Sequence, residues 1–181
     1  MSMIGNNLLN QIIIEKGITE PGEILNALNL GVQNSLKQGS NEIETSDGMD
    51  VALCAIDTTT REVQFAGAYR PMIIVSNGML EKVDGNKFPI GGKQMDNERN
   101  FKSHTRMMQP GDTIYLFSDG YADQFGGPRG KKFMVKRMDE LILGMQQMDM
   151  TEQERIMDET LEKWRGIYQQ VDDILVIGIR F

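Results

Sequence analysis

Apolar residues with helical spacing predict two helices at the start of the chain. Both stripes recur every three or four residues, which places their members on one face of an α-helix. The first stripe comprises Ile4, Leu8, Leu9, Ile12 and Ile13, and the second comprises Ile24, Leu25, Leu28, Val32 and Leu36. Thr19 is the expected cap of the second helix, and Pro21 suits its first turn. The first stripe starts almost at residue 1, without a capping residue or a loop before it.

Short apolar runs between turn residues predict an antiparallel meander in the middle of the chain. The runs cover residues 49–56, 63–69, 72–75, 80–83, 101–108 and 113–117. The run 49–56 is apolar on both faces, which is typical of a strand inside a sheet. The dipeptide Asn77-Gly78 predicts a tight hairpin, and the stretch 109–112 (QPGD) predicts a type II turn. The polar segments 38–48 and 84–100 are expected to be connections without regular structure.

Two more helices and a last strand are predicted in the final third of the chain. The third helix carries Val135, Met138, Leu141, Ile142 and Met145, and the fourth carries Ile156, Leu161 and Trp164. Thr151 and Glu154 have the spacing of a capping box, and Gly166 suits the end of the fourth helix. Residues 126–132 (GGPRGKK) read as a mobile loop, and residues 174–179 as a strand. The predicted class is α+β, in one domain over residues 1–181.

The composition narrows the choice of partner and compartment. A net charge of −7 and a pI of about 4.8 argue against general binding to nucleic acid or to anionic membranes. No apolar window has the length of a membrane span, and no basic region precedes the first apolar residues, as it does in a signal peptide. Cys54 is the only cysteine and is expected to be a buried thiol in a reducing compartment. We therefore expect a cytoplasmic protein.

Acidic residues stand at the ends of two predicted strands. Asp119 follows the run 113–117, and Asp172 and Asp173 precede the run 174–179. If these strands are antiparallel neighbours, the carboxylates converge and repel one another unless a proton or a cation lies between them. Mg²⁺ and Mn²⁺ prefer such oxygen ligands, and Gly120 would let a hydrated ion approach the backbone. The alternative, on spacing alone, is that these are solvated turn residues.

Four segments resemble the SpoIIE-type serine/threonine phosphatase domain. These are YLFSDGYADQFGG, the PGD turn before it, FAGAYRP and the closing VDDILVIGI. The resemblance extends in order over essentially the whole chain. It places the chain in a bacterial branch of the metal-dependent PPM (type 2C) phosphatases, and it implies a sandwich of antiparallel sheets flanked by helices, with a two-metal site.

The resemblance also implies roles for individual residues. Asp119 matches the aspartate of the family's TDG or SDG motif, with Gly120 beside it, and Asp172 matches the other late metal ligand. Asp119 and Asp172 are therefore the expected catalytic and metal-binding residues, and Gly120 and Asp173 complete the expected metal set. Asp173 stands where relatives have Asp or Asn, and Leu175 stands where many have Thr, which would alter the hydrogen bonding behind the ligands.

One part of the family pattern is not found in this sequence. The Gly-Asp-rich strand and the D-x-x-G-H-G-x-P element, which supply further metal contacts, are expected before a segment resembling residues 1–9. We therefore expect an N-terminally truncated form of the fold, with weak binding of Mn²⁺ or Mg²⁺ and little activity of its own. Strands lost from a sandwich expose sheet edges, so self-association or domain swapping is also expected.

The function implied by the resemblance is hydrolysis of phosphoserine or phosphothreonine on a bacterial regulatory protein. Anti-sigma-antagonist proteins are typical substrates of the family, whose members often form the output end of longer, sometimes membrane-tethered, chains. Arg70 and Arg129 are candidate substrate contacts, against the simpler reading of a plain turn and a solvated loop. Two alternatives remain: an inactive module that binds a phosphoprotein without turnover, and a structural domain with incidental acidic residues.

Overall fold

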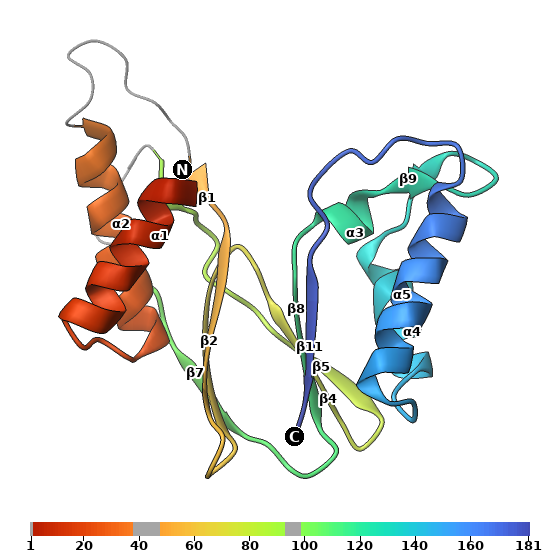
Figure 1. The fold of residues 1–181 in the computed structure, drawn as a ribbon, viewed down its shortest axis with the longest axis horizontal. Helices are drawn as coiled ribbons and strands as arrows, with labels where there is room; N and C mark the ends of the chain where they lie inside the picture. Colours follow the sequence, from red (N-terminus) through yellow and green to blue (C-terminus); the bar gives the residue numbers. More distant parts are fainter. Residues whose placement is uncertain (1, 38–47, 93–98) are drawn as a thin grey trace. The chain divides into compact units, whose positions relative to one another are not determined.

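The computed structural model describes residues 2–37, 48–92 and 99–181 (Figure 1). Most of the expected loop 38–48 and residues 93–98 of the second connection lie outside this range. The chain divides into two compact units, each with its own core. The first unit comprises Met1–Met72 and Val83–Met108, and the second comprises Ile73–Lys82 and Gln109–Phe181.

The first unit contains the two helices predicted at the start of the chain. Helix α1 (Ser2–Asn10) continues into a π-helical turn, η1 (Gln11–Glu15), and α2 (Pro21–Lys37) follows. The predicted stripes supply most of this unit's core, which includes Ile12, Ile24, Leu25, Leu28, Val32, Ala66, Ala68, Ile90 and Phe101. Ile13 is an exception at 38% exposure. A π-helical turn has a different periodicity, so it moves Ile13 off the buried face.

Both predicted helix caps are wrong by one or two residues. The Glu20 carboxylate, not Thr19, accepts a hydrogen bond from the Glu23 amide at 2.6 Å. Helix α5 (Met150–Arg165) is capped by Asp149, whose side chain accepts from the Glu152 amide at 2.8 Å. In both helices a second acceptor lies one or two residues from the predicted cap, and the first helical residue decides which of them meets a free amide.

The sheet of the first unit has the order β2-β3-β7, with β2 (Val51–Asp57) at an edge. Strands β2 and β3 (Glu62–Ala68) form the predicted hairpin, paired from Val51↔Ala68 to Asp57↔Glu62. The prediction of an internal strand at 49–56 is wrong, because β3 takes the central place and β2 is only half-buried. The short strands β1 (Gly48–Met49) and β6 (Ile90–Gly91) pair separately.

Strand β7 (His104–Met107) is shorter than the predicted run 101–108. The residues before it bond to helix α2 instead of to a strand. The Phe101 amide donates to the Asn26 side chain at 2.8 Å, and the Ser103 hydroxyl accepts from the Gly22 amide at 2.8 Å.

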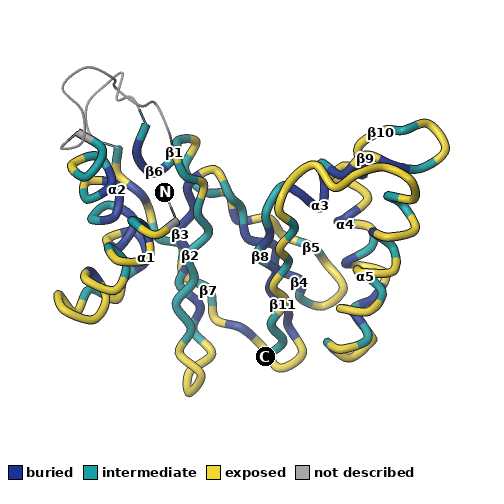
Figure 2. The backbone as a smooth tube through the Cα atoms, turned by 45° about the horizontal axis from the view of Figure 1, so that its top comes forward, coloured by how far each residue is buried: buried dark blue, intermediate teal, exposed yellow. Residues whose placement is uncertain are grey.

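The second unit packs helices on a sheet of order β11-β8-β4-β5. Its strands are β4 (Met72–Ser76), β5 (Met79–Val83), β8 (Thr113–Phe117) and β11 (Val176–Arg180). Its helices are α3 (Gly120–Asp123), α4 (Val135–Gly144) and α5. The core joins strand residues Ile73, Val75, Tyr115 and Phe117 to helix residues Met138, Ile142, Met157 and Leu161. Figure 2 draws the buried stretches of β4 and β8 in dark blue. The predicted turns at Asn77-Gly78 and at 109–112 are confirmed, with φ angles of 51°, 74° and 91° at Asn77, Gly78 and Gly111.

The expected mobile loop at 126–132 is instead part of a small hairpin. Strand β9 (Phe125–Gly126) pairs with β10 (Lys131–Lys132), in the register Lys131↔Gly126 and Lys132↔Phe125. The observed mixture of helices and antiparallel strands confirms the α+β class. Within the described ranges, no helix combines the length and apolar character that a bilayer span requires.

Candidate metal and phosphate site

The end of β8 and the start of β11 lie at the same edge of the sheet in the second unit. The two strands pair antiparallel from Val176↔Phe117 to Arg180↔Thr113. This confirms the neighbour relation on which the proposed convergence of acidic residues depends. Asp119 is the second residue after β8, and Asp172 and Asp173 lie on the segment leading into β11.

Ser118 joins the two strand ends through three hydrogen bonds. Its hydroxyl donates to the carbonyl of Asp173 at 2.8 Å and accepts from the amide of Leu175 at 3.0 Å. Its own amide donates to the carbonyl of Leu175 at 3.0 Å. No role for Ser118 was predicted, because its hydroxyl bonds reach residues 55 and 57 positions away in the sequence.

Gly120 is required by packing between these two segments. A Cβ atom on Gly120 would lie 2.4 Å from the carbonyl oxygen of Asp173 and 2.9 Å from its carbonyl carbon. The space next to this glycine is therefore filled by the backbone of the acidic segment. This differs from the sequence-based explanation, in which the missing side chain made room for a hydrated ion.

Comparison with known protein families identifies the family of the chain that carries this site. The model for Stage II sporulation protein E (SpoIIE) matches residues 1–181. The chain belongs to the SpoIIE family. Comparison with curated proteins gives no match.

Solved structures of SpoIIE-type and other PP2C phosphatase domains share this fold. The SiaA-PP2C domain of Pseudomonas aeruginosa is 26% identical, with a TM-score of 0.84 over 99% of this chain and 68% of that one. The PP2C domain of SpoIIE from Bacillus subtilis, with a fragment of its regulatory domain, is 21% identical, with a TM-score of 0.69 over 98% of this chain and 48% of that one. The RsbU and RsbW domains of Rv1364c from Mycobacterium tuberculosis are 20% identical, with a TM-score of 0.67 over 97% of this chain and 45% of that one. The chain thus spans about half the length of the latter two. By family, it is a serine/threonine phosphatase domain, a hydrolase.

The three acidic residues of this SpoIIE-family chain differ in exposure and bonding. Asp119 is half-buried, and its carbonyl accepts from the Asp123 amide at 2.9 Å as α3 begins. Asp172 and Asp173 are exposed. The Asp172 carboxylate accepts from the Asp173 amide at 2.7 Å, and the Asp172 carbonyl accepts from the Gln170 side chain at 2.7 Å. The turn before β11 is therefore held by its own polar groups.

The carboxylate ligands at this edge of the sheet are of the type that a hard divalent cation prefers, but they are too few for a complete metal site. PPM phosphatases depend on metal, and carboxylate oxygens are the ligands that Mg²⁺ and Mn²⁺ prefer. However, the residues that the structure describes contain no group of three or more His, Cys, Asp or Glu side chains arranged to hold a metal. Two monodentate carboxylates alone would make a weak site.

The two arginines predicted to contact substrate occupy different surroundings. Arg70 belongs to the first unit and forms an ion pair with Asp50 at 2.8 Å. Arg129 is exposed in the connection between β9 and β10 of the second unit. Nearby in that unit, Lys132 pairs with Asp123 of helix α3 at 2.8 Å, which connects the basic hairpin to the helix that follows Asp119.

Proposed function

We propose that this chain is the phosphatase domain of a bacterial signalling protein and hydrolyses phosphoserine or phosphothreonine through a metal-activated water. The observation that carries the proposal is the joint between β8 and β11, in a chain that the SpoIIE model matches along its length. Residues 1–181 would act as one phosphatase domain.

Asp119 and Asp172 are the proposed catalytic residues, each giving carboxylate oxygens to the metal. Gly120 allows the close approach of the two segments, and Asp173 is held in place through its carbonyl by Ser118. A Mn²⁺ or Mg²⁺ ion held by these carboxylates would supply an acidified water and would neutralise charge on the phosphoryl group. One related structure, that of the SpoIIE phosphatase domain of Bacillus subtilis, was presoaked with Mn.

The proposed substrate is a phosphorylated regulatory protein of the anti-sigma-antagonist type. The similarity to RsbU and RsbW domains and to a cell fate determinant supports a signalling role. Arg70 and Arg129 are proposed to contact this substrate. We place the domain in the cytoplasm, with no role for nucleic acid and no membrane contact of its own.

A second candidate function is a phosphatase-fold module that binds a signalling partner without turnover. It is favoured by the small number of acidic ligands gathered in the described part of the chain. The two functions make different predictions for the same experiment.

The experiment combines calorimetry with Mn²⁺ and turnover of p-nitrophenyl phosphate. We expect a dissociation constant in roughly the millimolar range and little turnover, because few protein ligands are available. Asp119→Asn and Asp172→Asn should each remove this binding. Asp158→Asn, an exposed acid on α5, is the matched control and should not change it.

The outcomes separate the candidates. Slow turnover that Asp119→Asn abolishes would establish the enzyme, and fast turnover lost in the same variant would contradict our expectation of a weak site. Binding that depends on Asp119 without any turnover would favour the inactive module. Mn²⁺ binding that is equal in all variants would remove the assigned site altogether.

A further inference from the structure

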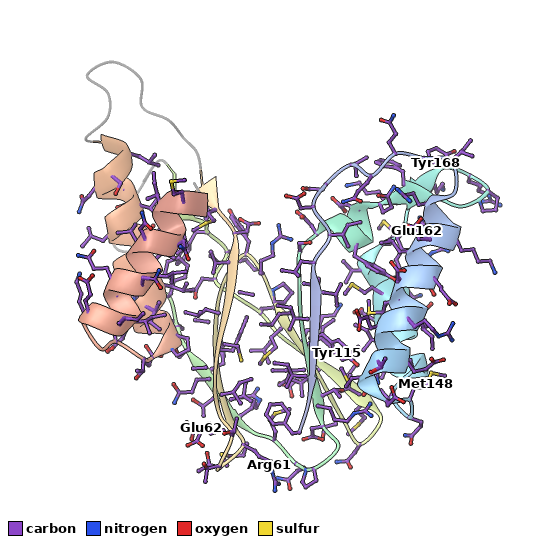
Figure 3. The ribbon with its side chains drawn as sticks, in the orientation of Figure 1. Arg61, Glu62, Tyr115, Met148, Glu162 and Tyr168 are labelled. Atoms are coloured by element: carbon purple, nitrogen blue, oxygen red, sulfur yellow. The ribbon has the colours of Figure 1, made fainter. Side chains whose placement is uncertain are left out.

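A cleft in the second unit has no part in the phosphatase chemistry proposed above. Its volume is about 910 Å³, which is near the upper end of the range for ligand sites. Its walls come from the β9–β10 hairpin, helices α4 and α5, and the segment that follows α5. The labelled Tyr168 marks that segment in Figure 3.

The floor of the cleft is apolar and held in place. Trp164 packs edge-to-face on Phe133 with ring centroids 5.4 Å apart, and its indole nitrogen donates to the carbonyl of Gln124 at 3.1 Å. Leu141 and Pro128 extend the apolar wall. Because the indole is fixed from two sides, the surface is formed before any partner arrives.

The lip of the cleft exposes further apolar groups. Gly166 ends α5 with a φ of 54°, and the chain then presents Ile167 at 97% exposure and Tyr168 at 41%. Exposed apolar groups that adjoin an apolar cleft are typical of a protein-binding surface.

The charge around the cleft is opposite in sign to that of the whole chain. Three cations, Arg137, Lys163 and Arg165, line the cleft with one acid, Glu140, and Arg165 is paired with Glu162, which does not line it. The guanidinium of Arg137 lies 4.4 Å from the centre of the Trp164 ring. The adjoining β9–β10 hairpin adds Arg129 and Lys131, in a chain of net charge −7. The cleft is therefore suited to an apolar group that carries negative charge beside it.

We propose that this cleft binds a segment of a partner protein in which an apolar side chain is flanked by carboxylates. The cations come from both α4 and α5, so they would meet acidic residues on either side of a buried apolar anchor. The cleft is open at Ile167 and Tyr168, which suits a peptide segment better than an enclosed small molecule.

The segment that forms the lip also leads directly to the acidic strand ends. The side chain of Gln124, at the end of α3, donates to the carbonyl of Gln169 at 3.0 Å, and the chain then continues to Asp172. The occupant would thus belong to the phosphoprotein substrate, and this assignment rests on the proposed function. The binding itself needs no metal and no phosphate.

Trp164 provides a specific test, because it is the only tryptophan in the chain. The probe is a synthetic peptide in which a leucine and a phenylalanine are flanked on both sides by glutamates, without phosphate or metal. We expect a saturable change in Trp164 fluorescence. A matched peptide with lysines in place of the glutamates should bind at least about ten-fold more weakly.

Variants of the chain distinguish binding of the peptide at the cleft from non-specific electrostatic attraction. Ile167→Asp and Lys163→Glu should each weaken binding of the glutamate peptide by about ten-fold. Lys136→Glu makes the same charge change on α4 at a residue that does not line the cleft, and it should change affinity less than about two-fold. Circular dichroism shows whether each variant keeps its helices.

Several results would overturn the proposal. These are equal affinity for both peptides, no binding of either, or an effect of Lys136→Glu as large as that of Lys163→Glu. A Trp164 signal that varies with protein concentration alone, and disappears in Ile167→Asp, would show that a second copy of this chain covers the cleft. If the glutamate peptide does not bind but the chain shows metal-dependent turnover, the peptide-binding role of the cleft is wrong and the proposed function is unaffected.

Discussion

At the scale of single residues, close packing and burial explain features that the sequence only marked. Gly120 sits against the backbone of Asp173, and Cys54 lies half-buried on β2 instead of fully buried. Burial raises the pKa of the Cys54 thiol from 9.0 to about 11. The sequence showed a glycine after an aspartate and a cysteine in an apolar run, but not what surrounds either residue.

The packing at Gly120 predicts a strong effect of a single methyl group. Gly120→Ala should lower the free energy of unfolding by about 1–3 kcal/mol, because the added Cβ overlaps the carbonyl of Asp173. Gly144→Ala is the matched control, since a Cβ there meets nothing within 4 Å, and it should be neutral or slightly stabilising. Urea unfolding of both variants measures the difference, and equal stability would contradict the packing.

The thiol predicts a pH dependence of both reactivity and stability. In the folded chain, alkylation of Cys54 by iodoacetamide should be slow at pH 8 and rise towards pH 11, because only the thiolate reacts. Because the pKa of the thiol is higher in the folded chain than in the unfolded chain, the protonated thiol favours the folded state. This stabilisation is complete below pH 9 and is lost as the pH rises towards 11. The chain unfolded in urea is the control and should react with the profile of an ordinary thiol. If the folded chain showed the same pH profile of alkylation as the unfolded chain, Cys54 would not be buried.

At the scale of elements, the important joint is between β8 and β11. Antiparallel pairing brings their ends together, and the Ser118 hydroxyl connects residues 55 and 57 positions away in the sequence. The strands themselves were predictable from apolar runs. Their pairing was only a condition of the metal hypothesis, and the clamp was not foreseen.

Removal of the clamp should loosen the acidic segment without unfolding the chain. Ser118→Ala should cost about 1 kcal/mol and speed amide exchange at Leu175, because that amide loses its acceptor. Ser118→Thr keeps the hydroxyl and should restore most of the protection. Mass spectrometry measures the amide exchange at Leu175 and needs neither metal nor turnover. Unchanged exchange in Ser118→Ala would rule out the clamp.

At the scale of the whole molecule, the chain belongs to the SpoIIE family and divides into two units with separate cores. In the sheet formed by the described strands, β2 lies at an edge and is rich in apolar residues. Such edges favour pairing with another chain.

We therefore predict self-association of the chain. Light scattering across micromolar concentrations should give a mass that rises above the 20.4 kDa of one chain. Ile167→Asp is the control for association through the cleft and should leave this behaviour unchanged. A single species of 20.4 kDa at all concentrations would contradict the prediction.

The sequence alone determined the longer helices and strands, most of the core stripes of the helices, the two predicted turns and the family. These depend on residues that are close together in the chain, where periodicity and short motifs are preserved. Only the tertiary structure decided which residues cap α2 and α5, that β3 and not β2 is central, that Ser118 clamps the acidic segment, and that residues from 127 to 168 enclose a basic-rimmed cleft. Each of these depends on the exact starting residue of an element or on contacts between distant segments, which local patterns do not encode.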